Sequence, residues 1–437
     1  MALDVAIVGA GWAGMAAAVR ALELGHRVTV FEAARQLGGR ARGVPLALPD
    51  GREVMVDNGQ HILTGAYTEC LALMRRVGVD PDQALLRQPL ALTYPDGTGL
   101  RLPKLPAPLD ALLGILGARG WRLGERLALL AQARRWRRAG FVCDEALSVA
   151  DLCAQLPARL LDEFIEPLCL SALNTPMHRA SARVFLRVLH DGLFAASGGS
   201  NPLLPRCDLS ALFPQAAARW IEARGARVLT GQRIDALHWQ APHWRLAEQA
   251  FDRVVFATSA SNAASALVQS ALAAPDSIAS ALRGWNASAQ RLQHQHIATV
   301  YAQADATAPG PLLRAPMLAL RPGADGPAQF VFDRDAITRP QRATRVLAFV
   351  VSASTQERAE LTAAITAQAR RQLGLTVTAL LTVTEKRATF ACTPGLQRPP
   401  MRIAPGLLAC GDYIDGPYPA TLEGAVRSGL QAAQALG

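Results

Sequence analysis

The chain opens on a pattern typical of a buried parallel strand followed by a helix. Residues 3–8 form a short apolar run, and a glycine-rich turn follows at 9–14. Residues 15–24 are rich in Ala and Leu, and Gly25 follows where helices commonly end. A second apolar run occupies 27–32. Together these segments predict a βαβ unit of about thirty residues.

The middle of the chain predicts mainly helices. The proline-rich stretch 103–108 interrupts the strand-like pattern. Residues 109–170 have the composition of several helices, and another helix is expected over 182–189. A helix over 213–224 and a strand over 226–230 follow.

The second half of the chain favours strands. The segment 254–274 comes nearest to a membrane-spanning length, but Ser, Asn and Gln dilute it, so we expect a strand and then a helix. One long helix is expected over 355–373. The strands are expected at 238–246, 251–257, 298–303, 329–333, 345–351 and 375–387.

Composition narrows the partners. Half of the 437 residues are apolar and the net charge is +10. The chain has few aromatic residues, and no basic stretch interleaves with them, so nucleic-acid binding is not favoured. Two interpretations of the positive charge remain open: attraction to an anionic membrane or an anionic cofactor, and a solvated surface rich in Arg. The densest run of basic residues, 134–138, follows apolar segments at 109–116 and 127–130. Such a pattern is typical of a helix that lies in a bilayer interface, or of a helix whose charged face is solvated while its apolar face covers the core.

Cysteine usage favours a reducing compartment. The seven cysteines include no Cys-x-x-Cys pair, so neither a zinc site nor a disulfide framework is expected. The first strand begins by Leu3, which leaves no room for a cleaved signal peptide. We therefore expect a cytoplasmic protein, with peripheral contact at the inner face of the cytoplasmic membrane left open.

The glycines of the first turn suggest a phosphate-binding loop. Gly9 permits the tight turn, Gly11 lets the backbone approach a pyrophosphate, and Gly14 lets the helix lie close to the strand. The free N–H groups at the helix N-terminus favour an anion. Glu32 ends the second strand, where a carboxylate accepts hydrogen bonds from ribose hydroxyls and repels a 2′-phosphate. The unit thus predicts a dinucleotide other than NADP.

A second loop follows Glu32 closely. Gly38 and Gly39 would let its backbone approach the same cofactor, and Arg40 would pair with the phosphates. The next segment, which contains Gly59 and Gln60, is expected to run beneath a ring system.

The C-terminal end of the chain decides between FAD and NAD. Gly411 and Asp412 end an apolar strand, and a carboxylate there suits ribityl hydroxyls, which NAD lacks. A helix is expected to begin near Ala420, with Thr421 and Leu422 at its start. Its N-terminus would stabilise negative charge at the N1/C2 carbonyl edge of a reduced flavin. Both ends of the chain therefore predict FAD.

These elements predict an α/β fold. We expect a discontinuous, Rossmann-like FAD-binding domain with an inserted α+β substrate domain; the amine-oxidase-like form of this arrangement is what the family resemblance of the three sequence blocks described next implies. The FAD-binding domain is expected over 1–80, 205–262 and 399–437. The substrate domain is expected over 81–204 and 263–398.

Three blocks carry a resemblance to a known family. They are residues 57–67, residues 385–395 without 391–392, and the segments 411–413 and 418–429. The chain resembles the flavin amine oxidase and phytoene desaturase superfamily and, within it, the bacterial hydroxysqualene dehydroxylases. The resemblance implies FAD, an apolar isoprenoid substrate, and reductive dehydroxylation of hydroxysqualene to squalene for hopanoids. It also implies other enzymes of squalene formation as partners.

One residue departs from the amine oxidases. Those enzymes commonly carry a flavin-flanking aromatic two residues before the Glu of a C-terminal Glu-Gly-Ala, and here that position is Thr421. This disfavours an amine oxidase without excluding it. Two further hypotheses stay open: a carotenoid-type desaturase, and a non-catalytic, FAD-stabilised scaffold or lipid carrier.

The proposed reaction needs a proton donor, because hydroxide is a poor leaving group. His61 lies in the block expected beneath the flavin, and an unperturbed imidazole titrates near neutrality. Tyr413 and Tyr418 are the phenol candidates. His294 and His296 lack a third ligand, so no metal is expected. No Gly-x-Ser-x-Gly elbow supports hydrolysis.

Overall fold

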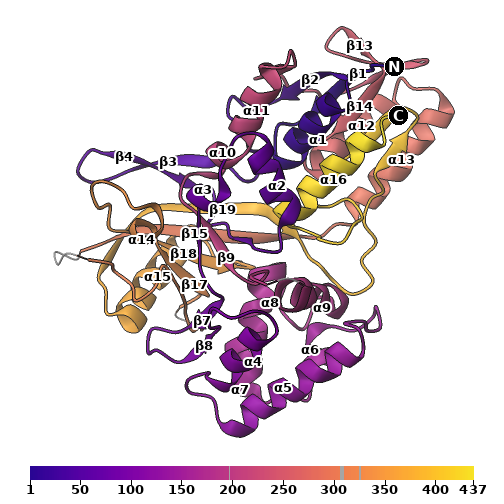
Figure 1. The fold of residues 1–437 in the computed structure, drawn as a ribbon. Coiled ribbons are helices and arrows are strands. Elements are labelled where there is room, and N and C mark those ends of the chain that lie inside the picture. The colour runs from indigo at the N-terminus through magenta and orange to yellow at the C-terminus, as the bar shows by residue number, and fades with distance from the viewer. Residues whose placement is uncertain (196, 306–309, 324–325) are drawn as a thin grey trace.

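The structure is a computed structural model that describes residues 1–195, 197–305, 310–323 and 326–437. A six-stranded sheet joins the two ends of the chain, with the order β10-β2-β1-β14-β21-β20 (Figure 1). All neighbouring pairs are parallel except β20 with β21. The strands are β1 (Asp4–Val8), β2 (Arg27–Glu32), β10 (Arg227–Thr230), β14 (Arg253–Phe256), β20 (Arg402–Ala404) and β21 (Leu407–Ala409). This arrangement confirms the Rossmann-like α/β fold.

Two helices from opposite ends of the chain lie side by side on this sheet. They are α1 (Trp12–Glu23) and α16 (Leu422–Gln434), coloured indigo and yellow in Figure 1. A Cβ atom on Gly429 would lie 2.2 Å from the Ala13 carbonyl oxygen, so the two backbones are in near contact. Small residues at this crossing therefore bring the N-termini of both helices to the same edge of the sheet.

Further helices complete the nucleotide-binding layers. The short α10 (Leu209–Leu212) leads into α11 (Pro214–Glu222), which packs against α1. After β14, α12 (Ala260–Ala271) and α13 (Asp276–Gln290) pack against each other as a helical pair.

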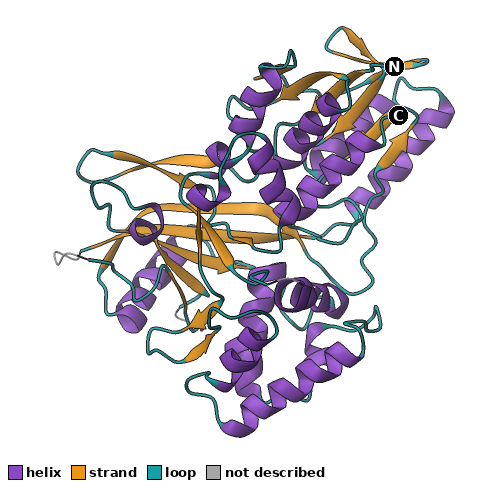
Figure 2. Cartoon of the chain, in the orientation of Figure 1, coloured by secondary structure: helices purple, strands orange, loops and turns teal. Residues whose placement is uncertain are grey.

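A second, antiparallel sheet lies beside the first, as Figure 2 shows. Its order is β16-β17-β18-β15-β19. One face packs on α15 (Arg358–Leu373) through an apolar cluster. The strands are β15 (His294–Ala304), β16 (Met317–Ala319), β17 (Phe330–Asp333), β18 (Val346–Ser352) and β19 (Val377–Phe390), and α14 (Arg334–Thr338) follows β17.

A helical layer closes the far end of the molecule (Figure 2). In the part of the chain that the structure describes, none of the helices has the length and apolar character needed to cross a bilayer. The layer contains α4 (Leu109–Leu116), α5 (Leu123–Arg138), α6 (Val149–Cys153), α7 (Ala158–Leu160), the π-helical turn Leu161–Ile165, α8 (Glu166–Leu173), α9 (Ala182–Leu189) and the π-helical turn His190–Ala195.

Small sheets and two further helices complete the fold. The helices are α2 (Thr68–Arg76) and α3 (Pro81–Ala84). The strands are β3 (Gly43–Ala47), β4 (Glu53–Asp57), β5 (Leu63–Thr64), β6 (Leu85–Arg87), β7 (Ala91–Thr93), β8 (Gly99–Arg101), β9 (Pro202–Pro205), β11 (His238–Gln240), β12 (His243–Leu246) and β13 (Gln249–Phe251).

Several sequence predictions need correction. The single strand expected at 238–246 is a hairpin of β11 and β12, whose turn contains Pro242, a residue without an N–H for strand pairing. The segment 251–257 is divided between β13 and β14. The first helix begins at Trp12, inside the glycine turn, because Gly11 is its N-cap. The expected domain boundaries stay a prediction.

A buried carboxylate ties the C-terminal helix to α2. The Glu423 side chain, fully buried in the first turn of α16, accepts hydrogen bonds from the backbone N–H groups of Glu69 (3.1 Å) and Cys70 (3.0 Å). It also pairs with Arg427 at 2.7 Å. A carboxylate at a helix N-terminus satisfies amides that have no partner within the helix. Glu423 is therefore a structural link rather than a group free for chemistry.

We expect Glu423→Ala to lower the free energy of unfolding by about 3–5 kcal/mol, because two α2 amides lose their acceptor and the partly buried Arg427 loses the nearer of its two carboxylate partners. Urea unfolding followed by circular dichroism measures this change. The control is Glu69→Ala, which removes an exposed carboxylate 4.0 Å from the same Arg427. Equal stabilities for the two variants would contradict the structural role of Glu423.

Candidate active site

A cavity of about 1180 Å³ lies where the carboxyl ends of β1, β14 and β21 meet. It exceeds the roughly 300–1,000 Å³ of ordinary small-molecule pockets. Its wall comes from the six-stranded sheet, from one face of the second sheet and from the end of α8. In open α/β sheets, ligands bind at this carboxyl edge.

The three glycines of the first turn have different surroundings. Gly9 has φ +111°, and a Cβ there would lie 2.8 Å from the Ala257 carbonyl oxygen. A Cβ on Gly14 would lie 1.9 Å from the Gly9 carbonyl oxygen. The fold itself therefore requires these two glycines. A Cβ on Gly11 would meet only Gly38 and Gly39, at an ordinary 3.7 Å or more, and Gly11 lines the cavity. Gly11 is thus open toward a ligand.

Glu32 lies at the same edge. Its carboxylate accepts hydrogen bonds from the backbone N–H groups of Ala10 (2.7 Å) and Ala34 (2.9 Å), and the residue lines the cavity. Gly38 donates its N–H to the Ala10 carbonyl oxygen at 3.0 Å. The second glycine loop is therefore fastened to the first, and both border the cavity together with Gly39.

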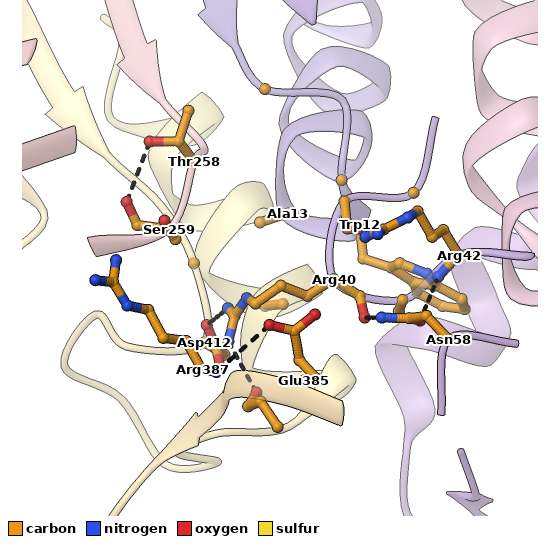
Figure 3. A pocket seen from close by; sticks show the side chains of 18 of the residues that line it. Trp12, Ala13, Arg40, Arg42, Asn58, Thr258, Ser259, Glu385, Arg387 and Asp412 are labelled. Carbon is orange, nitrogen blue, oxygen red and sulfur yellow. Dashed lines mark hydrogen bonds and ion pairs between the residues drawn. The ribbon is translucent and has the colours of Figure 1, made fainter. Parts of the chain in front are cut away.

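Arg40 and Asp412 form an ion pair on the cavity wall (Figure 3). Arg40 also donates to the Ala388 carbonyl oxygen at 3.0 Å, which connects the loop to β19. The Asn58 amide donates to the Arg40 carbonyl oxygen at 2.9 Å and accepts from the Arg42 N–H at 3.2 Å. The sequence predicts that Arg40 and Asp412 contact one cofactor, and the fold brings them together.

The start of α16 faces the cavity. Thr421 is the N-cap, and its hydroxyl accepts from the Gly424 N–H at 2.9 Å and donates to the Tyr418 carbonyl oxygen. Leu422, the first helical residue, also lines the cavity. Ala420 has φ +57°, a left-handed conformation that is strained for a residue with a Cβ. Such strain is typical of functional sites.

The part of the cavity beside the second sheet is apolar. Phe330 and Phe332 lie two residues apart on β17 and therefore share a face. Val350 on β18 is the strand partner of Phe330 and extends this face. Ile297 on β15 also lines the cavity. Leu170 adds a side chain from α8. A hydrocarbon would contact mostly carbon in this region.

His61 is one of the residues that line the cavity. Its Nδ1 lies 2.6 Å from the Gly59 carbonyl oxygen, which can only accept, so Nδ1 carries the proton. Burial lowers the pKa of His61 to about 4. The imidazole is therefore neutral near pH 7, and its Nε2 accepts hydrogen bonds. Gln60, also on the wall, accepts from Arg334 at 3.0 Å.

The two predicted phenols lie away from the described cavity wall. The Tyr413 ring packs edge-on against Trp285 with centroids 6.2 Å apart, and its buried hydroxyl has no partner among the described residues. The Tyr418 hydroxyl donates to the Asp191 carboxylate at 2.8 Å. Neither Tyr413 nor Tyr418 is among the residues that line the described cavity.

Tyr67 is a phenol on the described cavity wall that the sequence pattern did not single out. It lines the cavity, and its side chain interacts with that of Thr421. Burial raises the pKa of Tyr67 above its usual value, so the phenol stays protonated. The signal was present in the chain, because Tyr67 ends the block that carries the family resemblance.

The described residues contain no group of three or more His, Cys, Asp or Glu side chains arranged to hold a metal ion. His294 and His296 both lie on β15.

Comparison with known proteins decides the family. The model of the family described as flavin containing amine oxidoreductase matches residues 12–437. The chain belongs to this family. It is 28% identical over 453 residues to the hydroxysqualene dehydroxylase of Rhodopseudomonas palustris, covering 99% of this chain and 98% of that one. It is 25% identical to the Zymomonas mobilis hydroxysqualene dehydroxylase over 98% and 97% of the two chains. These matches confirm the resemblance found in the sequence.

A solved structure supports the fold. An oxidoreductase from Methanosarcina mazei superimposes with a TM-score of 0.73 at 17% identity, covering 98% of this chain and 99% of that chain. The protein is therefore an FAD-dependent oxidoreductase of the amine-oxidase fold.

The residues of the cavity fit FAD. Gly11 leaves the backbone open where a pyrophosphate would lie, and Glu32 lies where ribose hydroxyls would need an acceptor. Arg40 and Asp412 provide charge along the next stretch of wall, and Thr421 begins the helix whose N-terminus favours negative charge. When bound, the flavin accepts or donates a hydride equivalent. The assignment of individual residues to parts of FAD stays a prediction.

We expect Gly11→Ala to keep the fold but weaken FAD binding by roughly tenfold, about 1.4 kcal/mol. The new methyl group meets no close protein atom and protrudes where the cofactor must approach. Titration of the apoprotein with FAD, followed by flavin fluorescence, gives the affinity. Gly14→Ala is the contrasting variant and should fail to fold stably; unchanged FAD affinity in Gly11→Ala would contradict the placement.

Asp57 makes stability depend on pH. Its side chain is fully buried, Oδ1 accepts from the Leu209 N–H at 2.8 Å, and Oδ2 has no partner among the described residues. Burial raises the pKa of Asp57 to about 7, against the opposing effects of the Leu209 hydrogen bond and of Arg334. The folded state therefore holds a proton that the unfolded state releases above its ordinary pKa near 4. Stability should fall as pH rises from about 4 to 7 and then level off.

We expect Asp57→Asn to reduce the slope of the free energy of unfolding against pH by about 1.4 kcal/mol per pH unit, the value for the uptake of one proton. Urea unfolding of the holoenzyme at several pH values between about 4 and 8 measures it. The exposed Asp50→Asn is the matched control. Parallel curves for Asp57→Asn and the parent would show that Asp57 is ionised throughout.

Proposed function

We propose that this protein removes the allylic hydroxyl of hydroxysqualene and replaces it with hydride, giving squalene for hopanoid formation. The observation that carries the proposal is the cavity, which continues from the nucleotide-binding strand ends to an apolar face of the second sheet. The full-length similarity to two hydroxysqualene dehydroxylases supports it.

The chemistry requires both parts of this cavity. The C–O bond breaks as the oxygen receives a proton and leaves as water, and a hydride forms the new C–H bond at the same carbon. The allylic carbon carries positive charge while this happens, so water must be excluded. Phe330, Phe332 and Val350 provide a wall without nucleophiles. A hydrocarbon chain also gains from burial of its apolar surface there.

Tyr67 is the group that we assign to the leaving oxygen. Its phenol stays protonated, it lines the cavity, and it lies beside Thr421 at the start of α16. Hydroxide is more basic than a phenolate, so transfer of the proton is favourable as the bond breaks. His61 offers an acceptor at Nε2 near pH 7, which suits it to orient a hydroxyl rather than to protonate it. Tyr413 and Tyr418, outside the described wall, are less suited than Tyr67.

The direct test is anaerobic. The bound flavin is reduced, hydroxysqualene is added, and flavin absorbance and product mass are followed together. We expect reoxidation with one squalene formed per flavin. A flavin that stays reduced beside intact substrate would contradict the proposal. Linear polyenes offered to the oxidised enzyme would then test for a desaturase, and amines for an amine oxidase.

The proton donor is tested with Tyr67→Phe. We expect this variant to retain FAD and lose turnover by about 10²–10⁴-fold, the usual contribution of acid catalysis. Tyr94→Phe is the matched control, because Tyr94 donates to the Glu163 carbonyl oxygen outside the cavity wall.

The pH profile distinguishes the two acids. If Tyr67 donates, the rate is flat from about pH 5 to 8, because the pKa of its buried phenol lies above that range. If His61 donates, the rate rises as pH falls toward its pKa of about 4, because the imidazole must first be protonated. A rising profile that His61→Gln abolishes would overturn the assignment to Tyr67.

A further inference from the structure

Exposed leucines concentrate on one short part of the surface. Thirteen large apolar side chains are markedly exposed in the described chain, and seven of them lie between residues 105 and 127. They belong to α4, the turn before it and the start of α5. We call these residues the leucine surface: Leu105, Leu109, Leu112, Leu113, Leu116, Leu123 and Leu127.

On α4 these side chains form a continuous outer face. Leu109, Leu112, Leu113 and Leu116 have the i, i+3, i+4, i+7 spacing of one side of a helix. A surface helix of a globular protein normally has polar residues there.

The inner face of α4 is already occupied. Ala111 and Ile115 are buried, and a Cβ on Gly114 would lie 2.4 Å from Leu102 Cδ2. The helix is thus packed tightly onto the protein through one apolar face. The outer leucines are a second apolar face, so the core of this protein does not explain them.

The charge around the leucine surface is strongly positive. Residues 104–143 contain eight basic and two acidic residues. Both acidic side chains turn inward: Asp110 is buried, and Glu125 accepts from the Arg122 N–H at 2.6 Å and lies 3.8 Å from Arg159. Lys104, Arg119 and Arg122 are exposed at the rim.

We propose that the leucine surface docks on an anionic lipid bilayer. An apolar face with a basic rim is complementary to the acyl boundary and to anionic headgroups. Figure 1 shows α4 and α5 at the opposite end of the molecule from β1 and β2, so docking leaves the nucleotide-binding sheet away from the membrane. The inference stands on this surface alone. If the proposed function also holds, docking places the enzyme where an apolar isoprenoid alcohol dissolves.

The test compares holoenzyme binding to vesicles by cosedimentation. The vesicles are phosphatidylcholine alone or with about 30% phosphatidylglycerol. We expect binding to the anionic vesicles, weakening with salt because the basic rim is screened. The double variant Leu112→Asp/Leu116→Asp should bind at least tenfold less, with its bound flavin unchanged. The matched control is Leu272→Asp, since Leu272 is 79% exposed but follows α12 of the nucleotide-binding layers.

Two results would overturn the proposal. One is equal vesicle binding by the double variant, the control and the parent. The other is a dimer that forms without lipid in sedimentation equilibrium and that the double variant abolishes, which would make the leucine surface a contact between copies of the chain. Failure of the anaerobic reaction with intact vesicle binding would contradict only the proposed function.

Discussion

The close packing of α1 on α16 is the contact on which the site depends. These helices come from opposite ends of the chain, and Gly429 lets their backbones approach until a single Cβ would no longer fit. Because they lie side by side, the glycine turn before α1 and the Thr421 cap of α16 open on the same cavity. A larger side chain at this crossing would separate two sets of cavity-lining residues that we expect to contact one cofactor.

The motifs of this family combine structural and functional residues, and the structure separates them. Glu423 belongs to the C-terminal Glu-Gly-Ala motif, yet its carboxylate is already hydrogen-bonded to two backbone amides of α2 and paired with Arg427. Gly9 and Gly14 are required by the backbone around them, whereas Gly11 is open to the cavity. Asn58 likewise fastens the Arg40 loop. Only part of each motif is therefore free to touch a cofactor or substrate.

Local patterns in the sequence predicted much of the nucleotide-binding half. The apolar run ending at Glu32 and the glycines around it specify a strand, a turn and a helix through contacts close in sequence. The hairpin at 238–246 was missed because residues on both sides of Pro242 favour strands equally. Among the catalytic candidates, Tyr413 and Tyr418 follow a cofactor strand in sequence, but only the fold shows that Tyr67, far away in the chain, borders the cavity instead. Long-range packing decides which tyrosine borders the cavity, and local sequence patterns carry no information about such packing.

The proposed function depends on one cavity that joins the nucleotide-binding strand ends to the apolar face of the second sheet. A crystal structure of the FAD-bound protein with a hydroxylated isoprenoid tests it most directly. We expect adenosine at Glu32, pyrophosphate at Gly11, and the hydrocarbon against Phe330 and Phe332 with its oxygen near Tyr67. A hydrocarbon bound elsewhere, with the cavity beside the second sheet closed to it, would contradict the account.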